Sequence, residues 1–402
     1  MNVIVMKFGG TSVANINKIK NVSKIVKKSL KKNTKLIVVL SAMSGVTNQM
    51  QKYLDEVNSD FGIENDLVLT SGEQVTIGLL SALLKKDKIK SIPLLGWQIP
   101  IITDKFHQKS KILNIDKKRI HSFLKKYDVI VLAGFQGISS NGHITSLGRG
   151  GSDTTAVAIA STIKASRCDI YTDVDGVYST DPNFVKNAKK IKKLAYEEML
   201  EMSSMGAKVL HTRSVELAMK NNLTLQVLSS ITQKKGTFVI DEDKLIEKEI
   251  VSGVSYSKNE SKITISGIAD RPGISARIFG LLAKNNINVD MIVQNISQDG
   301  VSANITFTVP NSELNYTSKL LSKNRKIINF NSIDKDEKVS KISVIGMGMM
   351  SQAGVAQKMF KTLADNKINI LAISTSEIKI SVLIEEKHTK TAVKSLHKAY
   401  KL

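Results

Sequence analysis

The chain has 402 residues and a formal net charge of +22, from 58 lysines and arginines against 36 acidic residues. At about 150 residues for each domain, this length allows two or three domains. An apolar content of 42% is that of an ordinary globular protein. The single cysteine, Cys168, excludes an intramolecular disulfide and a cysteine-rich metal site.

The N-terminus, MNVIVMKFGG, has no basic segment followed by an apolar one, so we expect no secretory signal. We also expect no membrane-spanning segment, because no apolar run reaches the roughly 20 residues required. A strong positive charge can indicate nucleic-acid binding. The lysines are scattered over predicted helices, however, and no nucleic-acid-binding motif accompanies them. We therefore predict a cytoplasmic protein with a solvated basic surface and neither a nucleic-acid nor a membrane partner.

Strands and helices alternate in the first half of the chain. An apolar strand at residues 3–6 runs into a Gly-Gly turn, and residues 13–31 then have helical periodicity. A second apolar strand follows at residues 36–40, and others are expected at residues 128–133 and 168–172. This order predicts an α/β fold, a three-layer sandwich around a mainly parallel sheet.

The last third of the chain contains one pattern twice. Residues from 262 read KITISGIADRPGISARIFGLLAKNNINV, and residues from 341 read KISVIGMGMMSQAGVAQKMFKTLADNKINI. Gly273 matches Gly354 and Phe279 matches Phe360, after a two-residue insertion. Such duplication indicates two copies of one packed unit, here a ferredoxin-like βαββαβ module. We expect a catalytic domain at residues 1–245, a linker at 246–261 that could supply an edge strand, and modules at 262–335 and 341–402.

Two glycine-rich loops carry candidate chemistry. Lys7 ends the first strand and precedes Gly9 and Gly10, whose backbone could approach an anion at a helix start. The loop is not a Walker A motif, and a plain turn is the alternative. In the second loop, GRGGSD, Arg149 has the planar fork that fits a carboxylate, and the three glycines leave room for a ligand. Asp153 could accept from an ammonium group or position a metal or a lysine, or simply cap the helix.

A third segment, YTDVDGVYSTDP at residues 171–182, ends a strand in acidic residues and a glycine turn. It lacks the later ligands of a calcium-binding EF-hand loop, so we favour a nucleotide-facing turn. Glu73 lies near a helix start, where it could equally be a partner of the helix dipole. His211 and Arg213 lie near the end of an amphipathic segment, and we expect them to be structural or at an interface.

Taken in order, these loops resemble the amino-acid kinase family, and within it the aspartate kinases. The repeat is similar to the tandem ACT modules of feedback-regulated members. The matching segments are KFGGTSV at 7–13, SAM at 41–43, TSGE at 70–73, AGFQG at 133–137, LGRGGSDTTA at 147–156 and YTDVDGVYSTDP at 171–182. The resemblance implies ATP-dependent phosphorylation of the aspartate β-carboxylate to 4-phospho-L-aspartate, the first step toward lysine, threonine and methionine. That carboxylate is already ionised, so no general base is needed, and catalysis depends on placement and charge neutralisation.

The resemblance also implies roles for individual residues. Lys7 would draw charge from the transferring phosphate, with Asp153 ordering Lys7 or the substrate amine. The implied aspartate-binding residues are Ser41, Thr47, Glu73, Arg149, Gly150 and Ser152, with Arg149 on the α-carboxylate. The implied ATP-binding residues are Lys7, Phe8, Gly9, Gly10, Thr172, Asp173, Tyr178, Ser179, Thr180, Asp181 and Pro182. Mg²⁺ would be bound through the phosphates, with no protein metal site.

ACT modules usually pair edge to edge and hold an amino acid at the interface, which implies a homodimer or a higher homo-oligomer. Lysine, threonine or both are the implied effectors. The implied effector-binding residues are Asp270, Gly273, Ile274, Ser275, Asn288, Asp290, Gln294 and Asn295. The second repeat lacks the Asp-x-Pro element, which disfavours a second effector site there. Two alternatives remain: a kinase of this fold acting on glutamate, carbamate, acetylglutamate or a nucleoside monophosphate, and a non-catalytic amino-acid sensor.

Overall fold

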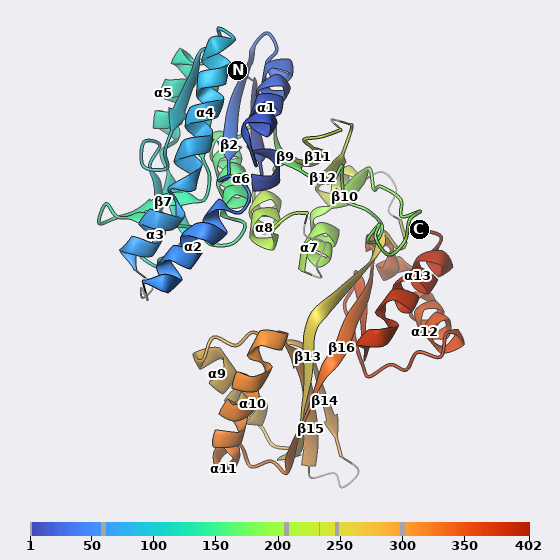
Figure 1. Ribbon diagram of the computed structural model, residues 1–402. Helices are drawn as coiled ribbons and strands as arrows, with labels where there is room; N and C mark the ends of the chain where they lie inside the picture. The colour runs from blue at the N-terminus through green and yellow to red at the C-terminus, as the bar shows by residue number, and fades with distance from the viewer. Residues whose placement is uncertain (1, 58–61, 205–208, 233, 246–248, 298–301) are drawn as a thin grey trace. The chain divides into compact units, whose positions relative to one another are not determined.

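The computed structural model describes residues 2–57, 62–204, 209–232, 234–245, 249–297 and 302–402. The chain divides into two compact units (Figure 1). The first unit comprises Met1–Val177 and Lys190–Ile246. The second comprises Tyr178–Lys189 and Glu247–Leu402. The segment Tyr178–Lys189 therefore belongs to the second unit, although the sequence analysis placed it within the catalytic domain.

An eight-stranded sheet forms the centre of the first unit. Neighbouring strands are parallel except β11 and β12, which confirms a mainly parallel sheet. The central strands are buried on both faces, as continuous runs of Val, Ile and Leu predict. In spatial order the strands are β10 (Lys193–Ala195), β12 (Thr237–Ile240), β11 (Leu225–Ser229), β9 (Arg167–Thr172), β1 (Asn2–Phe8), β2 (Thr34–Leu40), β6 (Val129–Ala133) and β3 (Ser91–Leu94).

Helices cover both faces of this sheet. On one face α1 (Ile16–Ser29) and α4 (Gly72–Lys86) contact each other, and their apolar residues join a core with the side chains of β1, β2 and β6. On the other face lies α6 (Gly151–Ile163), which is buried along nearly its whole length. Its alanines and threonines are small enough to let it pack closely on β1 and β9. Helices α5 (Lys117–Lys126) and α8 (Thr212–Lys220) contact α6.

Smaller elements complete the first unit. Helices α2 (Val46–Glu56) and α3 (Ile63–Leu69) contact each other, and α3 packs on β8 (Ile144–Ser146). Helix α7 (Tyr196–Ser204) packs on α8. A separate four-stranded sheet has the order β5 (Ile112–Ile115), β4 (Ile101–Thr103), β7 (Gln136–Ser139) and β8 (Ile144–Ser146).

The stretch Ile63–Lys86, which contains α3 and α4, is long and apolar enough to cross a membrane. The sequence predicted no membrane-spanning segment, and within the described residues this is the one stretch that passes the test of length and composition. Half of its most apolar window is buried inside the protein, and Ile77, Leu80 and Leu84 belong to the core of the first unit. A core helix of a soluble protein has these properties, so the stretch is weak evidence for a membrane span.

The second unit is built on one antiparallel sheet of six strands. Two long strands, β13 (Gly253–Ala269) and β16 (Ser332–Ile345), run side by side through its middle (Figure 1). The outer strands are β14 (Asp290–Ile296) and β15 (Ser302–Val309) beside β13, and β18 (Lys379–Glu385) and β17 (Ala372–Thr375) beside β16. The helices are α9 (Ile274–Lys284), α10 (Leu314–Lys323), α11 (Arg325–Ile328), α12 (Val355–Asp365) and α13 (Thr389–Tyr400).

Each long strand serves both repeats. The first half of β13 pairs Gly253 with Ile345 and is the edge strand beside the second repeat. The second half of β13 pairs with β15 and with the first half of β16. The aligned glycines Gly273 and Gly354 both have a φ of +91° and both precede an 11-residue helix. The duplicated sequence thus corresponds to a duplicated structure.

Candidate active site

The loops that follow four neighbouring strands of the large sheet are joined by backbone hydrogen bonds. Ser41 donates to Phe8 O at 3.2 Å, Gly134 donates to Leu40 O at 2.9 Å, and Gly9 donates to Tyr171 O at 3.4 Å. These bonds place the ends of β1, β2, β6 and β9 in a row. Ligands of open α/β sheets bind at the carboxyl ends of the strands, so this edge is the candidate active site.

Lys7 and Asp153 form the central ion pair of this edge. The Lys7 ammonium lies 2.5 Å from Oδ1 of Asp153, and the two side chains are 12% and 11% exposed. A side chain at Gly9 would lie only 3.2 Å from the Lys7 nitrogen, so the glycine leaves the ammonium open on that side. Of the two roles considered for Asp153, ordering Lys7 is the one that matches this contact.

Glu73 is buried at the start of α4. Ala42 N–H donates to its Oε1 at 3.0 Å, and Oε2 is buried without a hydrogen-bond partner among the described residues. Burial raises the pKa of Glu73 to about 8, against the lowering effect of the bond from Ala42. The carboxyl group is therefore protonated at neutral pH. A buried acid with a perturbed pKa and an unused oxygen is typical of a functional site.

Ser41 and the start of α2, which carries Thr47, pack against the start of α4, which carries Glu73. Ser41 O accepts a hydrogen bond from Thr76 of α4 at 2.9 Å, so the end of β2 is tied to the helix that carries Glu73. Thr47 is the second residue of α2 and is half-buried. Gly10 fits closely against Ala42, where a Cβ would lie 3.1 Å from its carbonyl oxygen. The segments KFGGTSV, SAM and TSGE of the sequence analysis are thus packed together.

The Arg149 loop corrects one expectation. Its glycines were expected to leave room for a ligand, but at Gly148, Gly150 and Gly151 the room is filled by protein. Gly148 has a φ of +75°, and a Cβ there would lie 2.7 Å from Gln108 O. Gly150 has a φ of +71°, and a Cβ there would lie 2.4 Å from the ring of His211. The Arg149 side chain is exposed, and Ser152 packs against Gly134.

The predicted nucleotide-binding residues are divided between the two units. Thr172 is the last residue of β9 in the first unit, and it donates a hydrogen bond to Asp173, the next residue, at 2.9 Å. The Phe8 ring is buried and stacks on Tyr171 at 4.5 Å, so only its backbone remains for a ligand. The remaining residues, Tyr178, Ser179, Thr180, Asp181 and Pro182, lie in the second unit. Their role in binding ATP stays a prediction.

Within the second unit these residues have structural partners. Ser179 Oγ lies 3.0 Å from His397 Nε2, and Asp181 accepts a hydrogen bond from the Tyr256 hydroxyl at 2.8 Å. Phe184 stacks on Tyr256 at 4.6 Å. The sequence analysis missed these contacts because His397 and Tyr256 are far away along the chain and no pattern links them to the YSTDP motif.

Some of the predicted effector-binding residues lie at the start of α9. Gly273 is its N-cap, and Ser275 donates to Gln294 of β14 at 2.9 Å. Asp270 and Asn288 are exposed. Ile274 is 4% exposed and belongs to the core of the first repeat, so its side chain is not available to an effector. Asn295 follows Gln294 on the strand and therefore points to the opposite face.

Asp290 already has a cationic partner. It forms an ion pair with Lys341 of β16, whose ammonium also lies 3.3 Å from Glu260. Burial acts to raise the pKa of Asp290, but the hydrogen bond and charge of Lys341 outweigh it, and the pKa is lowered. This ion pair joins the two repeats through a residue predicted to bind an effector.

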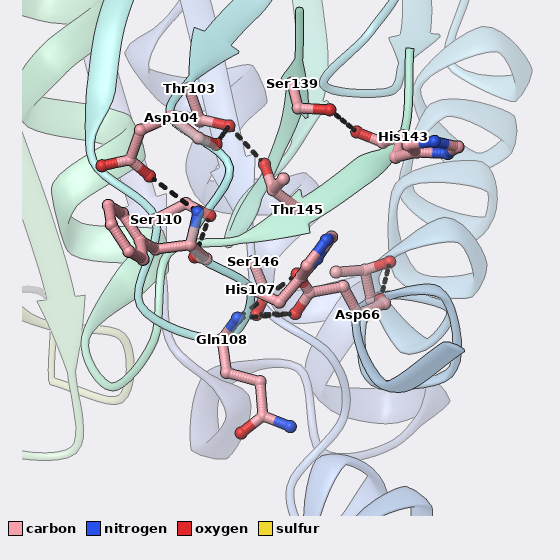
Figure 2. A network of polar contacts seen from close by, with 12 residues as sticks. Asp66, Thr103, Asp104, His107, Gln108, Ser110, Ser139, His143, Thr145 and Ser146 are labelled. Carbon is pink, nitrogen blue, oxygen red and sulfur yellow. Dashed lines mark hydrogen bonds and ion pairs between the residues drawn. The ribbon is translucent and has the colours of Figure 1, made fainter. Parts of the chain in front are cut away.

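A polar network around Asp66 escaped the sequence analysis (Figure 2). Asp66 is fully buried in α3, and its carboxylate contacts Ser146 Oγ at 2.5 Å and His107 Nδ1 at 2.7 Å. The signal that could have found it is an aspartate inside an apolar helical run, ENDLVL. Within the part of the chain that the structure describes, no group of three or more His, Cys, Asp or Glu residues could hold a metal ion.

Comparison with known proteins assigns the class of enzyme. Residues 2–229 match the model of the amino acid kinase family, and residues 263–324 and 342–400 match an ACT domain. An aspartate kinase of Pseudomonas fluorescens is 47% identical over 406 residues, which cover all of this chain and 98% of the relative. The chain therefore belongs to the aspartate kinases of the amino acid kinase family. It is a phosphotransferase with ACT regulatory domains.

Solved structures agree with this fold. Aspartokinase III of E. coli in complex with aspartate and ADP, described as the R-state, has a TM-score of 0.81 at 24% identity, with 99% of each chain covered. The same enzyme in complex with lysine and aspartate, described as the T-state, has a TM-score of 0.76 at 25% identity, covering 98% of this chain and 99% of that chain. The predicted α/β fold with its C-terminal antiparallel modules is confirmed.

Proposed function

We propose that the γ-phosphoryl group of ATP is transferred to the β-carboxylate of L-aspartate at the edge formed by β1, β2, β6 and β9. The observation that carries this proposal is the Lys7–Asp153 ion pair beside Gly9 at the end of the central strand. A fixed ammonium group next to a glycine backbone is suited to a phosphate in transfer. The complex of E. coli aspartokinase III with aspartate and ADP supports the same choice of ligands.

Each residue at this edge has one chemical task in the proposal. Lys7 neutralises charge that develops on the transferring phosphoryl group, while Asp153 holds its ammonium in place. Arg149 binds the α-carboxylate of aspartate through its planar fork. Glu73 and the hydroxyls of Ser41, Thr47 and Ser152 line the rest of the aspartate pocket. The acceptor carboxylate is ionised at neutral pH, so the reaction needs alignment rather than a base.

ATP binding involves Thr172, Asp173 and the backbone of Phe8, Gly9 and Gly10. Tyr178, Ser179, Thr180, Asp181 and Pro182 are proposed as further ATP-binding residues. Mg²⁺ bound through the phosphates would neutralise their charge, as in other phosphoryl transfers.

The ACT modules are proposed to bind lysine, threonine or both as feedback inhibitors in a cytoplasmic enzyme. The E. coli relative bound to lysine and aspartate in its T-state supports an amino acid as effector. An effector ammonium group at Asp290 would compete with Lys341 for the same carboxylate. The outer strands β14 and β17 expose Ile292, Ile296 and Ile373, and such apolar edges favour pairing with a second copy.

A coupled assay of ADP release with aspartate, with glutamate and without an acceptor tests the proposed reaction. Turnover that requires aspartate is expected. Turnover with glutamate alone would instead favour another kinase of this fold, and none with any acceptor would favour a sensor. Titrating lysine and threonine separately and together then identifies the effector. An activity unchanged by both amino acids would refute the proposed regulation.

A further inference from the structure

Arg213 joins two loops beside the candidate aspartate pocket. It lies in the first turn of α8, and its guanidinium donates from Nη1 to Leu147 O and from Nη2 to Ser110 O, both at 2.9 Å. Leu147 opens the loop that carries Arg149. Ser110 closes the loop of residues 104–110, which follows β4. The planar guanidinium of Arg213 therefore fixes the distance between the backbones of these two loops.

Asp66 ties the same two loops together at a second point (Figure 2). Its buried carboxylate accepts from Ser146 Oγ at 2.5 Å, on the residue before Leu147. It also accepts from Gln108 N at 3.0 Å, within the loop of residues 104–110. A backbone hydrogen bond also joins the two loops directly, from Ser110 N to Ser146 O at 3.0 Å. The Asp66 carboxylate and the Arg213 guanidinium thus hold the same junction, where the loop of residues 104–110 meets the segment Ser146–Leu147.

The Arg149 loop is closely confined on this inner side. Gly148 lies against Gln108 O and Gly150 against the His211 ring, at distances that leave no space for a Cβ. Arg149, between these two glycines, is exposed and has no salt bridge among the described residues. The backbone of the loop is therefore set by its protein contacts, while its single charged side chain remains available to a ligand.

We propose that Arg213 is a positioning residue for aspartate binding, which acts by holding the backbone of the Arg149 loop. The inference rests on the proposed contact between Arg149 and the α-carboxylate of the substrate. Two carbonyl oxygens on different loops need two donors in a fixed plane, which arginine has and lysine lacks. A displacement of about 1 Å at a substrate-binding group can cost about 100-fold in rate, so a relaxed loop should be visible in kinetics.

The test compares Arg213→Lys, Arg213→Ala and Asp66→Asn in the full chain. Each should raise the KM for aspartate about 10-fold or more and leave the KM for ATP within about twofold, because the loop contacts only the acceptor. Added guanidinium ion should partly restore the KM of Arg213→Ala. If Arg213→Ala does not fold, the lysine variant carries the test. An unchanged KM for aspartate in folded Arg213→Lys would overturn the proposal.

Arg167→Ala is the matched control. Arg167 is a half-buried arginine of the same unit, and it bonds Asp169 at 2.7 and 3.1 Å, not the backbone of a loop. Its loss should lower the melting temperature without changing the KM for aspartate. An equal rise in KM in this control would show that the Arg213 effect reports only general destabilisation, and would overturn the proposal.

A double-mutant cycle separates this inference from the role of Arg149. If Arg213 acts through Arg149, then Arg213→Lys should add little to the KM of Arg149→Ala, and the two effects should be strongly non-additive. Additive effects would contradict the positioning role while leaving Arg149 as a substrate-binding residue. An unchanged KM for aspartate in Arg149→Ala alone would instead refute the proposed contact of Arg149.

Discussion

At the scale of single residues, the candidate site holds two acidic groups in opposite ways. Asp153 has a cation at 2.5 Å, whereas Glu73 is buried with only a backbone donor at 3.0 Å. A partner that is charged stabilises a carboxylate, and burial without such a partner favours the neutral acid. The two residues therefore lead to different experimental predictions, one about turnover and one about pH.

Replacing Lys7 with alanine should lower kcat by about 100-fold or more, because the charge that stabilises the transferring phosphoryl group is lost. The circular dichroism spectrum of Lys7→Ala should match that of the wild type, because the fold is expected to stay intact. Lys35→Ala is the control, since Lys35 also pairs with an aspartate, Asp128, at 2.8 Å in the same sheet. Steady-state kinetics gives kcat for both variants, and only Lys7→Ala should show the loss. A kcat near that of the wild type in Lys7→Ala would contradict the assigned role.

The raised pKa of Glu73 makes stability depend on pH. Between about pH 4.5 and pH 8 the unfolded chain releases the Glu73 proton, while the folded chain keeps it. The free energy of unfolding therefore falls as pH rises through this window. Glu73→Gln cannot release a proton and keeps an acceptor for Ala42. Its melting temperature should match that of the wild type near pH 4.5 and exceed it by roughly 10 °C or more near pH 8.

Thermal unfolding scans between pH 4.5 and pH 8.5 would measure this difference. Parallel melting curves for wild type and variant across the whole range would show that Glu73 ionises normally in the folded protein. The same variant should bind aspartate more weakly at high pH, because an ammonium group would then lack its carboxylate. The KM for aspartate, measured alongside, connects the titration to the proposed pocket.

At the scale of elements, strand β13 is part of the six-stranded sheet and also contacts the segment Tyr178–Lys189. Its residue Tyr256 stacks on Phe184 at 4.6 Å and donates to Asp181 at 2.8 Å. The periodicity of the sequence indicated the strands of the sandwich, since each is a short apolar run. It could not indicate this attachment, because a loop has no periodicity and its partner lies far along the chain.

Tyr256→Ala should destabilise the second unit by about 2–4 kcal/mol, the usual cost of removing a large packed side chain. Tyr256→Phe should cost only about 1 kcal/mol, since it removes one hydrogen bond and keeps the ring. Tyr316→Phe is the control, because its hydroxyl bonds Asn285 at an exposed site, and about 0.5 kcal/mol or less is expected. Denaturant unfolding measures all three. Equal losses for the phenylalanine and alanine variants would contradict a packing role for the ring.

At the scale of the whole molecule, the chain leaves the first unit at Val177 and returns at Lys190. The segment Tyr178–Lys189 packs on the rest of the second unit through Val185, in its core, and through the Ser179–His397 contact. A single domain boundary near residue 245 therefore separates Tyr178–Lys189 from the residues of the second unit on which it packs.

A chain truncated after residue 245 should keep the large sheet but lose the partners of this segment. Trypsin should then cut it rapidly after Lys186 or Lys189, while the full chain resists cleavage there, because proteases require locally unfolded backbone. Limited proteolysis with mass spectrometry identifies the cut sites. Equal resistance in the truncated and full chains would show that the segment is stabilised within the first unit.

The sequence by itself determined the two kinds of fold, the duplicated modules and the glycine loops at the ends of strands. These features depend on local periodicity and on motifs in which all informative residues are neighbours. Only the tertiary structure decided that Gly148 and Gly150 fit against Gln108 and His211, that Asp66 and Arg213 hold one junction, and that residues 178–189 belong with the second unit. Each of these contacts joins residues that are distant in sequence, and a close approach between such residues depends on how the whole chain packs, not on any local pattern.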